Sequence, residues 1–248
     1  MLIGAHRGDR VHYPENTLLA LKKAVEAGAS FVEFDIQLTR DAVPVMLHDA
    51  TLSRTGNIDA CILDLPLVEA IKQSVGEPLR FGERFQDIRI SSLKEVLLAF
   101  QGMPQISLFI EIKQESIAHF GVKTIVDKIL PLLELAGTTP CVMISDNRSA
   151  LQAFKRHTIP IGWVIRDLHH PTVDAMIRLM PDWVIINHLR LPDQFALLRP
   201  YRWMCYEVNE IALARRLYLR GIDAIETGDP ARINADKVFS DNHSPWEK

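Results

Sequence analysis

Four short stretches in the first half of the chain place ionisable residues at or near the end of an apolar run. They read "LIGAHR", "FVEFDI", "VMLHD" and "FIEIK". Their ionisable residues are His6, Arg7, Glu33, Asp35, His48, Asp49, Glu111 and Lys113. Histidines exchange protons near neutral pH, carboxylates bind cations, and arginine and lysine bind phosphate. These residue types are suited to acid–base chemistry on a phosphate group.

The alternation within two of these stretches predicts where the charges point. Residues two apart on a strand lie on the same side, so Glu33 should share a side with Asp35, and Glu111 with Lys113. The residues between them are apolar and should face the opposite way, toward covering helices. Neighbouring strands of this kind would bring three carboxylates, a lysine and the two histidines into one small volume.

Three ionised carboxylates in one small volume repel one another and lose hydration, so they need a cation or shared protons. Glu33, Asp35 and Glu111 are therefore predicted to bind a divalent metal. Oxygen ligands without cysteine or a paired-histidine spacing make Mg²⁺ the first candidate and Ca²⁺ the second, ahead of Zn²⁺.

The remaining charged groups can serve a phosphate held at this metal. We predict that Arg7 and Lys113 neutralise it, and that His6 and His48 share the roles of general acid and general base. The alternative for His6 is a buried histidine that only caps its strand, beside an arginine that is a surface charge. Asp49 is expected to orient His48.

A regular alternation of apolar runs and helical patterns predicts the strands and helices that position these groups. Apolar runs alternate with helical patterns roughly every twenty residues in the second half, which is typical of βαβ units with a parallel sheet. The expected strands are 2–6, 31–36, 107–113, 141–145, 161–165, 182–186, 203–208 and 222–227. Eight such strands close a TIM (β/α)8 barrel, whose active site lies at the carboxyl ends of the strands.

One further run, 43–49, does not fit this alternation because too few residues separate it from the strand at 31–36. We predict a hairpin with its tip near residues 40–41, which returns His48 beside Glu33 and Asp35. Residues 50–92 should form a short capping insertion over the barrel mouth. Asn16 is the candidate N-cap of the first helix, and the alternative for it is a contact to a residue of the site. With no linker visible, residues 1–248 are expected to form a single domain.

Composition excludes several classes of protein. The chain has 48% apolar and 24% charged residues, as an ordinary globular protein does. A net charge of −3 gives no basic surface for nucleic acid. No apolar run approaches the length of a membrane span, and no secretory signal is expected. Three scattered cysteines, Cys61, Cys141 and Cys205, favour reduced thiols and a cytoplasmic location.

The motifs together resemble the glycerophosphodiester phosphodiesterase family. The resemblance is carried by "AHRG", by "PENTLLALKKAVEAGASFVEFDIQLTRDAVPVMLHDATLSRT" and by "FIEIK", and it reaches the end through "YEVN" and "GIDAIETGDPARI". It implies a TIM barrel, a divalent metal held by Glu33, Asp35 and Glu111, and catalysis by His6 and His48. The implied reaction is metal-dependent hydrolysis of a glycerophosphodiester to sn-glycerol 3-phosphate and an alcohol, within lipid and glycerol metabolism.

Some positions depart from the family's pattern. Ala42 stands where members usually have glycine, "YEVN" replaces a motif that ends in "TVN" after tryptophan, and "ETGDP" replaces "TD-x-P". These changes bear on the alcohol side of the pocket. Tyr206 and Glu207 fall at a strand end that faces the site and are predicted to line the substrate.

Two other functions use similar residues. One is a phospholipase D-like or phosphoinositide phospholipase-like enzyme acting on intact lipid, which should have an apolar rim or a basic interfacial helix that we do not find. The other is a catalytically silent barrel that binds phosphorylated ligands. The residues leave open the head group, the nucleophile (water or a glycerol hydroxyl), which histidine is the base, and the oligomeric state.

Overall fold

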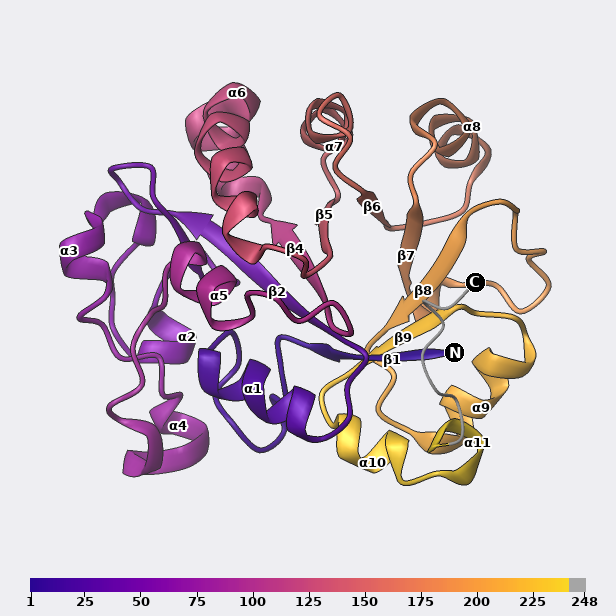
Figure 1. The fold of residues 1–248 in the computed structure, drawn as a ribbon, viewed down its shortest axis with the longest axis horizontal. Coiled ribbons are helices and arrows are strands. Elements are labelled where there is room, and N and C mark those ends of the chain that lie inside the picture. The colour runs from indigo at the N-terminus through magenta and orange to yellow at the C-terminus, as the bar shows by residue number, and fades with distance from the viewer. Residues whose placement is uncertain (241–248) are drawn as a thin grey trace.

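Eight parallel strands close into a ring surrounded by helices, as the sequence predicts (Figure 1). The computed structural model describes residues 1–240. The ring order is β1, β2, β4, β5, β6, β7, β8 and β9, and it closes because β1 pairs with both β2 and β9. This is a TIM barrel with one extra strand, β3, outside the ring.

The strands lie close to their predicted positions. They are β1 (Leu2–His6), β2 (Phe31–Leu38), β3 (Pro44–Met46), β4 (Ser107–Ile112), β5 (Cys141–Ser145), β6 (Ile161–Ile165), β7 (Trp183–Asn187), β8 (Arg202–Tyr206) and β9 (Ala224–Thr227). Predicted strand 203–208 ends two residues early, so Glu207 lies just beyond it with φ +64°.

Helices cover the outside of the ring. They are α1 (Leu18–Glu26), α2 (Ser53–Gly56), α3 (Leu67–Ala70), α4 (Pro78–Phe81), α5 (Leu93–Ala99), α6 (Gln114–Leu133), α7 (Arg148–Lys155), α8 (His170–Leu179), α9 (Ile211–Leu219), α10 (Pro230–Asn234) and α11 (Lys237–Ser240). Short 3₁₀ turns occupy Ile62–Asp64, Gly82–Phe85, Glu134–Ala136 and His188–Arg190. Phe34 and Ile112 pack in the layer between strands and helices, on the side predicted from the alternation.

The predicted hairpin is confirmed. β3 runs antiparallel to β2, with Ile36 opposite Met46 and Leu38 opposite Pro44. Ala42 in the connecting turn has φ +57°, a conformation in which a Cβ is strained and glycine is not. The family's usual glycine at this position therefore has a conformational reason.

The lower part of the barrel interior is a packed apolar plug. It contains Leu2, Phe31, Phe109, Val142, Ile144, Trp183, Ile185, Met204 and Ala224. The Phe109 ring lies 4.7 Å from the Phe31 ring and 5.4 Å from the Trp183 ring, between centroids. A Cβ at Gly4 would stand 2.1 Å from the Phe31 ring, so glycine is needed for this ring to fill the barrel axis.

Residues 50–92 form a compact segment beside β3, with a small apolar cluster of its own. The cluster includes Val45, Leu52, Ile62, Val75 and Ile90. Figure 1 shows α2, α3 and α4 grouped on one side of the ring. The segment contacts the loop after β1 through the side chains of Arg54 and Glu77, which both meet Glu15, and through the ring of Phe85, which lies 5.9 Å from that of Tyr13.

Two further expectations concern the whole chain. All three cysteines are free thiols. Among residues 1–240, no helix combines the length and the apolar character needed to cross a membrane.

Candidate active site

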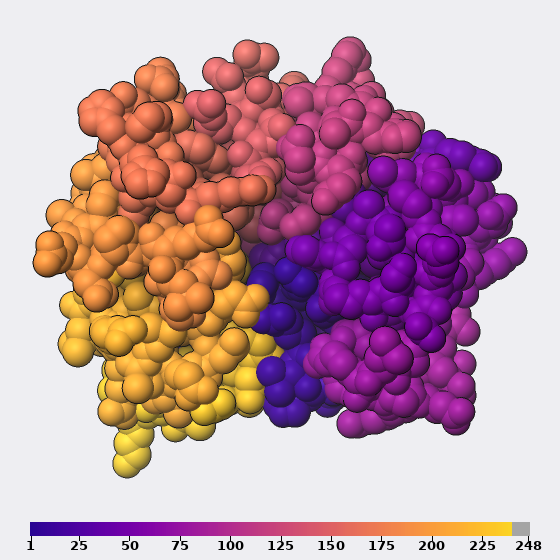
Figure 2. All heavy atoms as spheres, turned by 180° about the vertical axis from the view of Figure 1, so that it is seen from behind, coloured from indigo at the N-terminus to yellow at the C-terminus, as the bar shows by residue number. Residues whose placement is uncertain are grey.

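A polar cavity of about 140 Å³ opens at the carboxyl ends of the strands. Seen from behind, the surface is hollowed near its centre, where the indigo amino-terminal segment lies between the purple segment and the orange-yellow half (Figure 2). The cavity is lined by His6, Arg7, His48, Glu111, Lys113, Ile144, Val164, Ile185, Tyr206, Glu207 and Glu226. Two larger hollows, of about 450 and 670 Å³, lie at the amino-terminal end of the barrel and contain none of the predicted site residues.

His6 ends β1 and is buried between two carboxylates. Its Nε2 lies 3.9 Å from Glu33 Oε2, and its Nδ1 lies 3.5 Å from Glu207 Oε1. Arg10 fixes Glu207 through a contact of 2.6 Å. Burial and the charges of Arg7 and Arg10 hold the pKa of His6 well below its ordinary value. The imidazole is therefore neutral, with a carboxylate beside each nitrogen.

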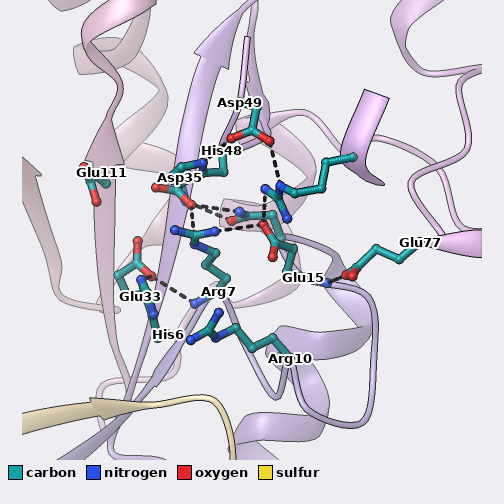
Figure 3. A network of polar contacts seen from close by, with 12 residues as sticks. His6, Arg7, Arg10, Glu15, Glu33, Asp35, His48, Asp49, Glu77 and Glu111 are labelled. Carbon is teal, nitrogen blue, oxygen red and sulfur yellow. Dashed lines mark hydrogen bonds and ion pairs between the residues drawn. The ribbon is translucent and has the colours of Figure 1, made fainter. Parts of the chain in front are cut away.

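Arg7 connects three carboxylates at the start of the next loop (Figure 3). Its backbone N–H donates to Glu33 at 2.9 Å, and its guanidinium lies 3.0 Å from Glu15 and 3.2 Å from Asp35. Burial alone would lower the pKa of Arg7, but Asp35 and Glu15 raise it. Arg7 therefore stays positively charged at the edge of the cavity.

Asn16 has a different role from the one predicted. Its side-chain amide donates to Asp35 at 2.8 Å, and its side-chain oxygen accepts the Asp35 N–H at 2.9 Å. The N-cap of α1 is Thr17, whose hydroxyl accepts from Ala20 N. The prediction of Asn16 as the cap was wrong because φ +51° at this residue turns its side chain toward β2.

Glu111 and Lys113 lie across the cavity on and just after β4. Lys113 Nζ is 3.2 Å from Asp35 Oδ1 and 3.1 Å from Glu111 Oε1. Burial opposes the charge of Asp35, but Lys113 and Arg7 hold its pKa well below the ordinary value. In this structure both predicted phosphate ligands contact carboxylates while they also line the cavity.

His48, which follows the hairpin strand β3, lines the same cavity, and its Nδ1 lies 2.5 Å from Asp49 Oδ1. Arg54, from the segment 50–92, contacts Asp49 at 2.7 Å and Glu15 at 2.8 Å. Through Glu15, this chain of contacts continues to Arg7 (Figure 3). The loops after β1 and β3 are thus fixed relative to each other.

Glu226 is the functional candidate that the sequence reasoning missed. It lies on β9 in register with Gly4 of β1, is 2% exposed, and its Oε1 has no hydrogen-bond partner. The alternation applied to Glu33 and Glu111 also places Glu226 inside the barrel, since it is two residues from Ala224 of the plug. That signal was present in "IDAIET" but was read only as a strand.

Tyr206 and Glu207 both line the cavity at the end of β8. The Tyr206 ring centroid lies 6.0 Å from that of His6. The wall of the cavity beside these two residues also includes the apolar side chains of Ile144 and Val164.

Unlike Asp35, the carboxyl groups of Glu33 and Glu111 resist ionisation in this structure. Burial, together with Asp35 and Glu226, raises the pKa of Glu33 well above its ordinary value. Burial and the charge of Asp35 raise the pKa of Glu111 to about 7. A cation among these oxygens would remove the repulsion and favour the ionised forms.

The donor set fits a divalent metal. One oxygen from each of Glu33, Asp35 and Glu111 lies within 4.8 Å of the other two. Glu33 Oε1 is buried without a hydrogen-bond partner. Carboxylate oxygens alone suit a hard ion such as Mg²⁺ or Ca²⁺.

Comparisons with known proteins agree with this geometry. The model of the glycerophosphoryl diester phosphodiesterase family matches residues 6–159. A glycerophosphodiester phosphodiesterase of Caldanaerobacter subterraneus is 36% identical over 156 residues, which cover 62% of each chain and so less than two thirds of that protein. YhdW of Bacillus subtilis is 30% identical over 95% of this chain and 98% of its own length.

The fold is similar to that of a phosphodiesterase of Oleispira antarctica, solved in complex with the product sn-glycerol-3-phosphate. The TM-score is 0.84 at 26% identity, over 95% of this chain and 96% of that one. The similarity therefore spans the whole ring and the loops that build the cavity.

Proposed function

The chain belongs to the glycerophosphoryl diester phosphodiesterase family of phosphoric diester hydrolases, and we propose that it hydrolyses glycerophosphodiesters to sn-glycerol 3-phosphate and an alcohol in a metal-dependent reaction. The observation that carries the proposal is one cavity that brings together two histidines, each beside a carboxylate, with further carboxylates and the positively charged side chains of Arg7 and Lys113. The Oleispira structure, whose bound product is the same glycerol phosphate, supports this substrate class.

Glu33, Asp35 and Glu111 would hold the divalent ion, with Mg²⁺ as the first candidate and Ca²⁺ as the second. When bound, this ion supplies charge neutralisation for the phosphate and polarises its oxygens. Asn16 and Arg7 orient Asp35 through contacts of 2.8 and 3.2 Å. The ligands are thus positioned by the loop after β1, not by the strands alone.

His6 and His48 share the proton transfers in this proposal. In each, Nδ1 faces a carboxylate, Glu207 for His6 and Asp49 for His48. An Nδ1–H tautomer leaves Nε2 free to take or give a proton. The two rings lie on different elements and line one cavity, so one can serve the nucleophile while the other protonates the leaving alkoxide.

Arg7 and Lys113 would bind the phosphate oxygens once a metal occupies the carboxylates they contact in this structure. Arg7 offers a planar guanidinium and Lys113 a movable ammonium, so the two are suited to different oxygens. Both keep their charge at all physiological pH values because neighbouring carboxylates raise the pKa of each, against the effect of burial.

Tyr206 and Glu207 would line the substrate beside the apolar wall of Ile144, Val164 and Ile185. At about 140 Å³ the cavity is smaller than the roughly 300–1,000 Å³ typical of drug-sized ligands. This size favours a small diester over an intact lipid, and so favours this activity over the phospholipase alternatives. A part in glycerol metabolism stays a prediction that follows from this substrate, and the cytoplasmic location stays a prediction that rests on the cysteines.

Hydrolysis assays on glycerophosphocholine, glycerophosphoethanolamine and glycerophosphoglycerol test the proposal. We expect release of glycerol phosphate from at least one of them, loss of activity in EDTA, and recovery on adding Mg²⁺ or Ca²⁺. Equal rates with and without chelator would rule out the metal-dependent reaction. No hydrolysis of any diester, with phosphorylated ligands still bound, would favour the silent barrel instead.

The nucleophile can be identified in the same assay by ³¹P NMR. A transient cyclic glycerol phosphate would show attack by the glycerol hydroxyl, and direct appearance of glycerol phosphate would show attack by water.

A further inference from the structure

Glu226 is a buried carboxylate that the proposed reaction does not use. Its Oε1 has no hydrogen-bond partner. Burial and the negative charges of Glu111 and Asp35 raise its pKa well above the ordinary value. An isolated buried carboxyl group with an orphaned oxygen is costly to a fold unless a ligand satisfies it. A hydrophobic residue would fill this position in the barrel at lower cost.

The neighbours of Glu226 supply the rest of a metal site. One ligand atom each of His6, Glu33 and Glu226 lie within 4.8 Å of one another, and all three residues are buried. Glu33 belongs to this group and also to the group with Asp35 and Glu111. A carboxylate has two oxygens, so Glu33 can face an ion on each side, as in paired-metal sites.

The ligand types differ between the two groups. The first has three carboxylates, whereas the second has one imidazole and two carboxylates, a set that suits a borderline ion such as Zn²⁺. A metal-bound histidine usually directs its other nitrogen toward a carboxylate. A carboxylate that could serve His6 in this way is nearby: Nδ1 has no hydrogen-bond partner in this structure, and Glu207 Oε1, on a side chain that Arg10 holds at 2.6 Å, lies 3.5 Å from it.

We propose that His6, Glu33 and Glu226 form a second divalent-metal site, selective for Zn²⁺, whose occupation withdraws His6 from the reaction. A nitrogen lone pair bound to zinc cannot accept a proton, so zinc at this site inhibits the enzyme. This inhibitory consequence rests on the proposed function, in which His6 transfers protons, whereas the binding of zinc does not.

Equilibrium dialysis with Zn²⁺ in the presence of excess Mg²⁺, followed by metal analysis, tests the binding directly. We expect one tightly bound zinc in the wild type. Glu226→Gln and Glu226→Met should each weaken zinc binding at least about tenfold. Asp35→Asn is the matched control, because it removes a carboxylate of the first group and should leave zinc binding intact. Melting temperatures verify that every variant is folded.

Zinc inhibition of diester hydrolysis is the second readout, measured relative to each protein's own zinc-free rate. The inhibitory zinc concentration should rise at least about tenfold in Glu226→Gln. Unchanged zinc binding in both Glu226 variants, or zinc lost in Asp35→Asn and kept in Glu226→Gln, would overturn the proposal. Zinc binding as expected with no diester hydrolysis at all would leave the site standing and refute the proposed function.

Discussion

The two ends of the barrel interior are built from opposite kinds of residue. Toward the amino ends of the strands, the space is filled by aromatic and aliphatic side chains around Phe31, Phe109 and Trp183. Toward the carboxyl ends, the strands carry buried ionisable side chains instead. On β1, His6 lies two residues after Gly4, and on β2, Glu33 lies two residues after Phe31. A change of two residues along a strand thus separates a packed core from a charged cavity.

The difference separates the part of the barrel that stabilises the fold from the part to which we assign the chemistry. The apolar plug gains free energy from burial and close packing, at about 25 cal/mol for each Å² removed from water. The charged end gains little of this, and it retains orphaned polar atoms on Glu33 and Glu226. Substitutions at the two ends should therefore alter different properties.

The largest effect is expected for the histidines of the charged end. His6→Ala and His48→Ala should each lower kcat by about 10²- to 10⁴-fold, because each removes a general acid or base. The double variant should lose less than the product of the two, since both act on one transition state. Steady-state kinetics measure the loss, and calorimetry should show that Mg²⁺ still binds. Near-normal turnover of His6→Ala with a much lower melting temperature would favour the structural role for His6.

A substitution in the plug should do the reverse. Phe109→Ala removes a ring in contact with Phe31 and Trp183, and should lower the free energy of unfolding by about 3–5 kcal/mol. The folded protein should keep most of its kcat, because no group of the cavity is removed. Urea unfolding and kinetics at low temperature measure the two quantities. A collapse of kcat with unchanged stability would show that the two ends are not separable in this way.

Metal removal should make the charged end sensitive to pH. In the metal-free protein the pKa of Glu111 is about 7, raised by burial and Asp35 from an ordinary 4.5. Between pH 4.5 and pH 7, Glu111 is therefore protonated in the folded state and ionised in the unfolded state. The free energy of unfolding is greatest at the acid side and falls as the pH rises through 7. In EDTA the melting temperature should drop by several degrees from pH 5 to pH 8.

Magnesium should reduce this drop, since it binds the ionised carboxylates more tightly as pH rises. Glu111→Gln is the matched control and should reduce the metal-free drop without abolishing it, because burial also raises the pKa values of Glu33 and Glu226. A metal-free melting temperature that rises steadily over the same range would contradict the assignment for Glu111.

The smallest effect is expected at the hairpin rim. Ala42→Gly should raise the free energy of unfolding by about 0.5–1 kcal/mol, because relief of the positive φ outweighs the added freedom of glycine in the unfolded chain. Asn57→Gly is the comparison, with φ +54° at a residue type that tolerates this conformation, and should gain less. Equal gains at the two positions would mean that strain at Ala42 is not the cause.

The sequence was sufficient for the features that depend on local periodicity. Alternation placed Glu33, Asp35 and Glu111 inside the ring, and the short gap before residue 43 indicated the hairpin that returns His48. The same reasoning places Glu226 inside, but in the expected strand 222–227 the other charged residue, Asp223, falls on the opposite side, so no second inward charge marked a site.

Contacts between loops distant in the chain could not be predicted. Arg54 meets Glu15 across 39 positions, and Glu77 accepts the Glu15 N–H across 62. Such pairs depend on how the segment 50–92 packs against β3, and no periodicity records this packing. Asn16 has a positive φ, which its residue type tolerates, but the contact of its amide with Asp35 on β2 is also between distant parts of the chain and is not recorded by periodicity.

Glu33→Gln tests most directly whether the carboxylates of the charged end bind a cation and do not stabilise the fold. Magnesium titration calorimetry and metal-free thermal unfolding should be measured on this variant and the wild type. We predict at least about tenfold weaker magnesium binding, with a melting temperature equal to or above that of the wild type, because a neutral amide replaces a buried carboxyl group whose ionisation the site opposes. Wild-type magnesium affinity together with a lower melting temperature would contradict the account.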